Sequence, residues 1–143
     1  MKIQFKKLHP RATIPTKGTE GSAAYDLYAV ETAYIPVRET VAVGTGLSLE
    51  IPEGWKGEIY SRSGLASKGI TVPNSPGKID SDYRGEIQVL LLNTNERDMA
   101  AIGPGDRIAQ FELSPVYDIE FEEVVTLSKT DRGEMGFGST GYH

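Results

Sequence analysis

Short segments of alternating apolar and polar residues, separated by glycine and proline, constrain the fold of this sequence most. Such alternation is typical of β-strands with one buried face. Residues 87–92 are apolar enough for a strand that is buried on both faces, and only residues 63–68 have a helical pattern, with Ser63 as a candidate N-cap. The alternating segments are residues 3–5, 40–43, 47–51, 55–60, 107–113 and 119–125. Many short strands with one short helix predict an all-β sandwich, barrel or jelly roll.

The composition limits the classes of function. The chain has 143 residues, which suits one domain. Its 20 acidic residues outnumber its 15 lysines and arginines, so the charge argues against nucleic-acid binding but permits a small phosphate-bearing ligand. Cysteine is absent, which excludes disulfides and thiolate metal sites. Without a secretory signal or an apolar run of about 20 residues, we expect a soluble intracellular protein with no membrane partner.

Five polar stretches that contain glycine interrupt the apolar pattern and are candidates for a functional site. They are residues 21–29, 62–66, 77–85, 105–110 and 132–141. Their order and spacing resemble the five motifs of the homotrimeric dUTPases, over nearly the whole chain. The resemblance implies a jelly-roll-like β fold of the β-clip type over residues 1–131. It also implies a flexible glycine-rich tail at residues 132–143 that closes over the active site.

The same resemblance implies an activity and an assembly. Members of the family hydrolyse dUTP to dUMP and pyrophosphate with Mg2+, which removes dUTP and supplies dUMP for dTMP synthesis. The expected partners are dUTP and further copies of this chain, in a homotrimer whose three active sites are each built from all three subunits. The expected location is the cytoplasm, or the interior of a host cell if the source is viral.

The tail has the chemistry of an anion site. Its glycines allow successive backbone N–H groups to turn inward, and Gly138, Ser139 and Thr140 supply N–H and hydroxyl donors. Arg132 can form a bidentate contact with a phosphate, and Phe137 can stack on a base. A mobile glycine-rich and serine-rich terminus explains the composition equally well. The resemblance favours the substrate-binding interpretation.

The third stretch contains a carboxylate and a tyrosine with distinct expected roles. A carboxylate held near a water molecule can act as general base for its attack on the α-phosphorus, and the resemblance assigns this role to Asp80. The resemblance places Tyr83 against the deoxyribose, where its ring leaves no room for a 2′-hydroxyl. Without the resemblance, Asp80 and Asp82 would serve a polar turn and Tyr83 would be an ordinary strand aromatic. We keep the turn interpretation for Asp82.

The resemblance further implies that the hairpin with Asn74, Gly77 and Ile79 recognises uracil. In the family its backbone mimics the pairing edge of adenine, so cytosine leaves buried polar groups unpaired. The close approach of the backbone to carbon 5 of the base rejects thymine.

Phosphate contacts are expected from two places in the sequence. Arg62, Ser63 and Gly64 stand at the start of the helical pattern, where hydroxyl and N–H groups suit a phosphate, although a plain N-cap explains them equally well. Gln110 occupies a position in a strand pattern where an apolar residue is common. Its amide can donate to a phosphate or face solvent.

Mg2+ is the expected cofactor. The resemblance implies that Asp26 supports the ion through water, which agrees with the tendency of Mg2+ to retain waters and to bind substrate phosphates. His9 and His143 are isolated in the sequence, so a zinc site is not expected.

Two other functions are compatible with the sequence. The dCTP deaminases share the fold implied here and are said to use a glutamate after the third motif, where Glu86 lies. Asp80, Tyr83 and the intact tail resemble the hydrolases instead. The second alternative is a regulator that binds a protein partner in response to nucleotide.

Overall fold

The computed structural model describes residues 1–141, so His143 lies outside the described part. Its regular structure consists of eleven strands and one short helix, which confirms the all-β prediction. The elements are β1 (Gln4–Lys7), β2 (Tyr25–Tyr28), β3 (Ala33–Ile35), β4 (Thr40–Gly44), β5 (Leu47–Glu50), β6 (Trp55–Tyr60), α1 (Ser63–Ala66), β7 (Ile70–Thr71), β8 (Gly77–Ile79), β9 (Gln88–Asn93), β10 (Ala100–Ile102) and β11 (Arg107–Pro115). Within residues 1–141, no helix is long and apolar enough to cross a membrane.

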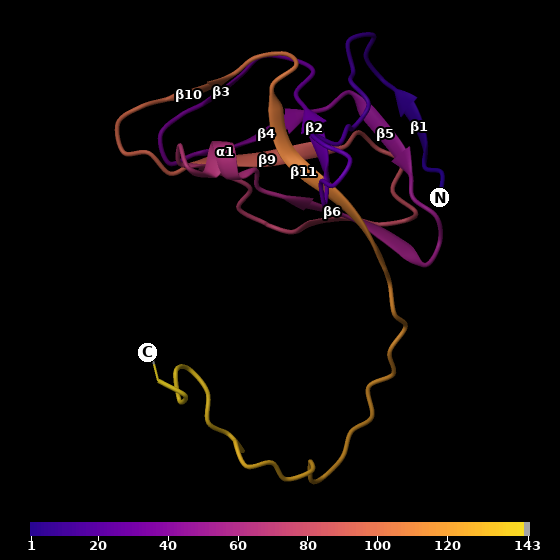
Figure 1. Ribbon diagram of the computed structural model, residues 1–143, viewed down its shortest axis with the longest axis vertical. Coiled ribbons are helices and arrows are strands. Elements are labelled where there is room, and N and C mark those ends of the chain that lie inside the picture. Colours follow the sequence, from indigo (N-terminus) through magenta and orange to yellow (C-terminus); the bar gives the residue numbers. More distant parts are fainter. Residues whose placement is uncertain (142–143) are drawn as a thin grey trace.

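Antiparallel pairing arranges the strands in four small sheets (Figure 1). The largest has the strand order β2-β11-β6-β8, and a second has the order β4-β9-β7. The remaining two are the pairs β1-β5 and β3-β10. In the largest sheet, Gln110 of β11 lies opposite both Asp26 of β2 and Tyr60 of β6. Because residues directly opposite each other in a sheet point to the same face, these three side chains share one face.

The other face of the four-stranded sheet packs into the core. Leu27, Ile59 and Phe111 are buried there, and each is a sequence neighbour of one of the three polar residues. The alternation that predicted strands at residues 55–60 and 107–113 therefore separates a core face from a polar face. The polar face is the one that carries Asp26 and Gln110.

The helix is shorter than the sequence pattern predicted. It ends at Ala66, and the N–H groups of Lys68 and Gly69 donate to the carbonyls three residues earlier instead of four. This tightening and the left-handed conformation of Gly69 (φ 82°) end the helix. The prediction of Ser63 as N-cap is also wrong. Arg62 is the N-cap residue, and no side chain caps the helix.

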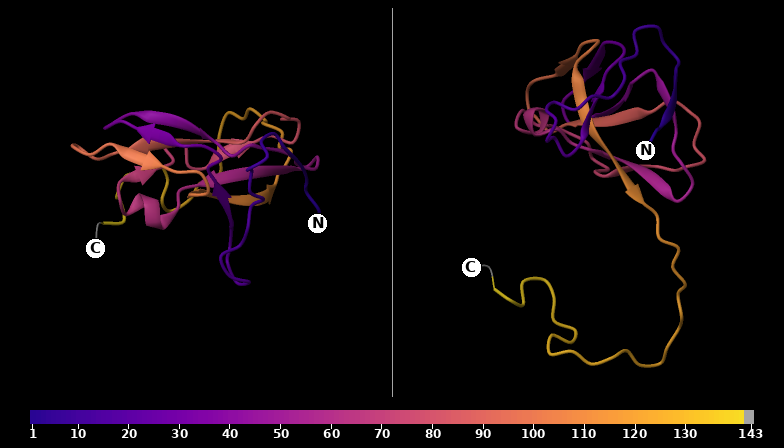
Figure 2. Two further views of the ribbon diagram at one scale, coloured as in Figure 1. Left: turned by 90° about the horizontal axis from the view of Figure 1, so that it is seen from above. Right: turned by 45° about the vertical axis from the view of Figure 1, so that its right-hand side comes forward.

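The prediction of a strand at residues 119–125 is wrong. The chain leaves the β body after Pro115 as a long extended segment, which Figures 1 and 2 show reaching away from the sheets. We call residues 116–131 the C-terminal arm. Phe121, in the middle of the arm, is 88% exposed. An alternating segment becomes a strand only when a neighbouring strand accepts its hydrogen bonds, and the arm has none within residues 1–141.

Candidate active site

Except for Ser63 and Gly64, the expected site residues of the β body line two separate hollows, each of about 310 Å³. The first, the β8 hollow, is lined by residues of β8 and of the segments on either side of it. The second, the β2 hollow, lies beside β2 and the start of β11. The β8 hollow contains Asn74, Gly77, Ile79, Asp80 and Tyr83. The β2 hollow contains Asp26, Arg62 and Gln110, together with Arg107.

One tight turn carries both chemical groups of the β8 hollow. Asp80 follows directly after β8 and is exposed. The N–H of Tyr83 donates to the carbonyl of Asp80 at 3.2 Å, which closes a turn of four residues. The Tyr83 hydroxyl donates to the carbonyl of Glu86 at 2.9 Å. The turn thus fixes a free carboxylate and an aromatic ring relative to each other.

A buried carboxylate between two arginines organises the β2 hollow. Asp26 is only 5% exposed. The Nε of Arg62 donates to its Oδ1 at 2.9 Å, and the Nη1 of Arg107 lies 3.7 Å from its Oδ2. Because a guanidinium carries five donors, Arg62 retains four N–H groups beyond this contact. Sequence reasoning did not single out Arg107, although it stands in the stretch 105–110.

The donor set of the β2 hollow fits Mg2+ held through water better than Mg2+ held directly. Both oxygens of Asp26 face arginines, and residues 1–141 contain no group of three or more acidic, histidine or cysteine side chains that could hold a metal. A carboxylate has about four acceptor positions, so Asp26 can still accept hydrogen bonds from water. Mg2+ commonly keeps several waters and binds through substrate phosphates and one or two carboxylates.

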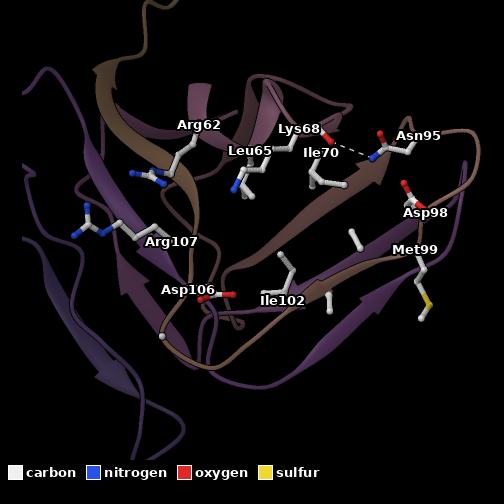
Figure 3. Close-up of a pocket in the computed structure, with 13 residues that line it drawn as sticks. Arg62, Leu65, Lys68, Ile70, Asn95, Asp98, Met99, Ile102, Asp106 and Arg107 are labelled. Carbon is white, nitrogen blue, oxygen red and sulfur yellow. Dashed lines mark hydrogen bonds between the residues drawn. The ribbon is translucent and has the colours of Figure 1, made fainter.

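A third and larger hollow, of about 640 Å³, adjoins the two arginines. It extends between α1 and β10, and Figure 3 shows Arg62 and Arg107 together at one end of it, with Asp98 and Met99 at the other. Arg62 and Arg107 line both this hollow and the β2 hollow. Ser63 and Gly64 follow Arg62 at the start of α1, where both are exposed. Arg62 and Arg107 therefore lie where the β2 hollow meets the larger hollow.

A hydrogen-bonded cluster lies on the polar face of the four-stranded sheet. Glu58 accepts hydrogen bonds from the hydroxyls of Ser114 and Tyr60, the latter at 2.6 Å. The bond from Ser114, and then that from Tyr60, lowers the pKa of Glu58. The bond to Glu58 raises the pKa of Tyr60 to about 12. At neutral pH Glu58 is charged and Tyr60 is protonated, so the cluster is a fixed support and not an acid–base pair.

A single chain does not bring the expected site residues together. The β2 and β8 strands form opposite edges of the four-stranded sheet, which separates them by about 14 Å at the usual strand spacing. The tail lies away from the sheets (Figure 1). There, Arg132 donates to the carbonyl of Met135 at 2.8 Å, and Phe137 is fully exposed. The other expected tail residues, Gly138, Ser139 and Thr140, are exposed as well.

Comparison with known proteins decides the family. The dUTPase family model matches residues 10–141. The chain belongs to the dUTPase family. It is 49% identical to a deoxyuridine 5′-triphosphate nucleotidohydrolase of Nautilia profundicola, over 99% of each chain.

Solved structures agree on the dUTPase fold. A mutant dUTPase of Staphylococcus bacteriophage 80alpha with bound dUpNHpp has a TM-score of 0.89, 29% identity and 98% coverage of each chain. A mutant dUTPase of phage phi11 of S. aureus, described with a structural Mg(II) ion, has a TM-score of 0.81 and covers 90% of this chain. At 24% identity, the phi11 protein supports the fold alone. The predicted jelly-roll-like dUTPase fold is confirmed.

Within the dUTPase fold of this chain, Glu86 has a structural role. Its Oε1 accepts the N–H of Gly46 at 2.9 Å, and an added Cβ at Gly44 would lie 2.6 Å from the same oxygen. The carboxylate therefore fastens the link between β4 and β5 to the segment after the Asp80–Tyr83 turn. Glu86 also lines the β8 hollow, but its Oε1 is already engaged by this backbone N–H. This observation argues against the deaminase alternative.

Proposed function

We propose that this chain hydrolyses dUTP to dUMP and pyrophosphate by attack of water on the α-phosphorus. Family membership supports the substrate, and one observation of this molecule supports the chemistry. Asp80 is an exposed carboxylate at the rim of the β8 hollow, in the same turn as the ring of Tyr83. A carboxylate fixed beside a nucleoside-sized hollow can orient a water molecule and accept its proton.

The β8 hollow is proposed to hold the nucleoside. Asn74 and Gly77 are in contact, since an added Cβ at Gly77 would lie 3.0 Å from the Asn74 amide nitrogen. Ile79 lies beside Asp80 and adds an apolar wall. Backbone groups of this segment would pair with uracil and leave cytosine with mismatched donors, which gives strong discrimination.

The β2 hollow is proposed to hold the triphosphate. Arg62 offers its unused N–H groups, and the half-buried Gln110 lines the same hollow with its amide. Ser63 and Gly64, which follow Arg62 and are exposed, would add further donors. Mg2+ bound to the phosphates would offset the charge that develops on them. Asp26, in contact with both arginines, would accept hydrogen bonds from the waters of the ion.

The separation of the two hollows supports the proposal of a homotrimer with shared active sites. In the proposed trimer, the β8 hollow of one subunit and the β2 hollow of another would together form one site, because the two lie at opposite edges of a sheet within one chain. An exposed apolar groove of about 450 Å³ also supports assembly, with Ile3, Phe5, Ile14 and Tyr25 among its lining residues. Within residues 1–141, β1 pairs with β5 alone, so one edge of β1 beside the groove is open. An open strand edge of this kind accepts a strand from another chain.

The C-terminal arm has the pattern that such an edge requires. Ile119 and Phe121 are exposed apolar side chains, and they alternate with Asp118 and Glu120. In β1 and the residues before it, Met1, Ile3 and Phe5 alternate with Lys2, Gln4 and Lys6. The apolar sets match and the charges are opposite, so we expect the arm of one subunit to add a strand to β1 of the next. The tail that follows would then close over an active site of a neighbouring subunit.

The proposed function is tested by pyrophosphate release from dUTP, dCTP, dTTP and UTP with Mg2+ present. We expect rapid release from dUTP alone, because the base and the sugar are both recognised. Removal of Mg2+ with a chelator should strongly reduce the rate. Ammonia release from dCTP would instead support the deaminase. Nucleotide-dependent capture of a protein without turnover would support the regulator.

Replacing Tyr83 is expected to relax the recognition of the sugar. The ring of Tyr83 lies in the β8 hollow and is proposed to exclude a 2′-hydroxyl by contact. For Tyr83→Ala we expect the ratio of kcat/KM for dUTP to that for UTP to fall by about tenfold or more, within the range that loss of one steric contact produces. Steady-state kinetics on both nucleotides measure the ratio. An unchanged ratio would remove this role from Tyr83.

A further inference from the structure

The ring of Tyr83 packs directly against Gly85, which has no side chain. A Cβ added at Gly85 would overlap the Tyr83 hydroxyl, and it would lie 2.6 Å from the ring Cζ and 3.0 Å from Cε2. These three ring atoms are the nearest heavy atoms to the added Cβ. Gly85 is absent from the glycines with positive φ, so an alanine is compatible with its backbone. The nearest groups that an alanine side chain would meet there belong to Tyr83.

The backbone around the ring is held independently. Nη1 of Arg84 donates to the carbonyls of Ser81 at 2.7 Å and Tyr83 at 3.1 Å. The hydroxyl of Ser48 on β5 donates to the carbonyl of Arg84 at 2.6 Å. The turn is therefore fastened to the β body through main-chain carbonyls. A change at Gly85 has little scope to move the turn, so the side chain of Tyr83 must move instead.

The ring itself has room to move. Tyr83 is 44% exposed, and its one side-chain hydrogen bond within residues 1–141 is the bond from its hydroxyl to the carbonyl of Glu86. A methyl group at residue 85 would push the ring off this contact and toward solvent. The cost to folding is small because the ring is only half buried. The cost to sugar recognition is large because that recognition depends on where the ring stands.

We propose that Gly85 is a specificity-determining residue that acts by seating the Tyr83 ring at the sugar position. This inference rests on the proposed sugar-reading role of Tyr83. Gly85 is a positioning residue, since it acts through Tyr83 and need not touch the nucleotide. The absence of a side chain at residue 85 is thus required for the rejection of ribonucleotides.

The test compares Gly85→Ala, Tyr83→Ala and the double variant in the full chain, by kcat/KM for dUTP and UTP. We expect Gly85→Ala to lower the dUTP-to-UTP ratio by about tenfold, as a displaced steric contact does. In the Tyr83→Ala background the same change should lower it no further, because coupled residues are not additive. Gly103→Ala is the matched control. An added Cβ at Gly103 meets only Asp106, at 3.6 Å, and the ratio should stay at the wild-type value.

Each outcome separates the inference from the proposed function. If Tyr83→Ala lowers the ratio and a folded Gly85→Ala does not, the inference is wrong and the proposed function stands. If neither variant changes the ratio, both the sugar role of Tyr83 and the role of Gly85 are wrong. The proposed function itself fails by a different result, which is that the wild-type protein releases no pyrophosphate from dUTP. If Gly85→Ala alone does not fold, folding of the double variant would identify the ring as the displaced group and support the inference. Unfolding of both would overturn it.

Discussion

Asp80→Asn is expected to abolish most turnover of dUTP while the fold and nucleotide binding persist. The amide is nearly isosteric with the carboxylate but cannot accept a proton from water at neutral pH. Loss of a positioned general base reduces rates by about 10²–10⁴. The fold should tolerate the change because Asp80 is exposed and its turn is closed by a backbone hydrogen bond, from the Tyr83 N–H to the Asp80 carbonyl. Measured kcat should therefore fall while the dissociation constant of a non-hydrolysable dUTP analogue stays near the wild-type value.

The same turn offers a matched control. Asp82 is an exposed carboxylate two residues further on, and the sequence assigns it a turn role only. Asp82→Asn removes the same charge from the same turn, so its kcat should remain near that of the wild-type protein. Equal losses in both variants would mean that the charge of the turn matters and not a base at Asp80. Substantial remaining activity in Asp80→Asn would exclude the assignment outright.

The sequence predicted the parts of this fold that depend on local pattern. The pattern at residues 107–113 predicted β11. It placed Gln110 where an apolar residue is common, whereas the structure pairs Gln110 with Asp26 on the polar face, after a register shift between Arg107 and Ala109. The five glycine-containing stretches correctly indicated the family. Local pattern failed where the answer depends on a neighbour. Residues 119–125 alternate as a strand does, but residues 1–141 contain no strand that pairs with them.

Contacts between distant segments were the other information that the sequence did not contain. Arg107 reaches Asp26 because β11 pairs with β2, and this register cannot be read from residues 105–110 alone. Arg62 meets Asp26 for a similar reason, since β6 brings its own end beside β11. The division of the expected site into two hollows also follows from strand order. The five stretches identified the candidate residues, but only the strand order shows that the two groups of residues lie at opposite edges of the sheet.

Two truncations are expected to separate assembly from catalysis. Removal of residues 132–143 deletes the tail but keeps the arm, so the protein should remain a trimer by light scattering. Activity should fall by about a hundredfold or more, because closure of a segment over a site excludes water and completes the set of contacts. Removal of residues 116–143 also deletes the apolar arm with Phe121. This shorter chain should be monomeric and inactive, and its β1 edge should remain uncovered.

Mixing variants then tests whether the sites are shared. Chains with Asp80→Asn retain an intact tail, and chains that lack residues 132–143 retain Asp80. If Asp80 and the tail at one site come from different subunits, trimers reassembled from both variants contain some sites with an intact copy of each. Activity should reappear on mixing, to a substantial fraction of the wild-type value. A chain that carries both defects should rescue neither single variant. Complementation would fail if each chain closed its own tail over its own Asp80, and a monomeric wild-type protein with full activity would exclude the shared site altogether.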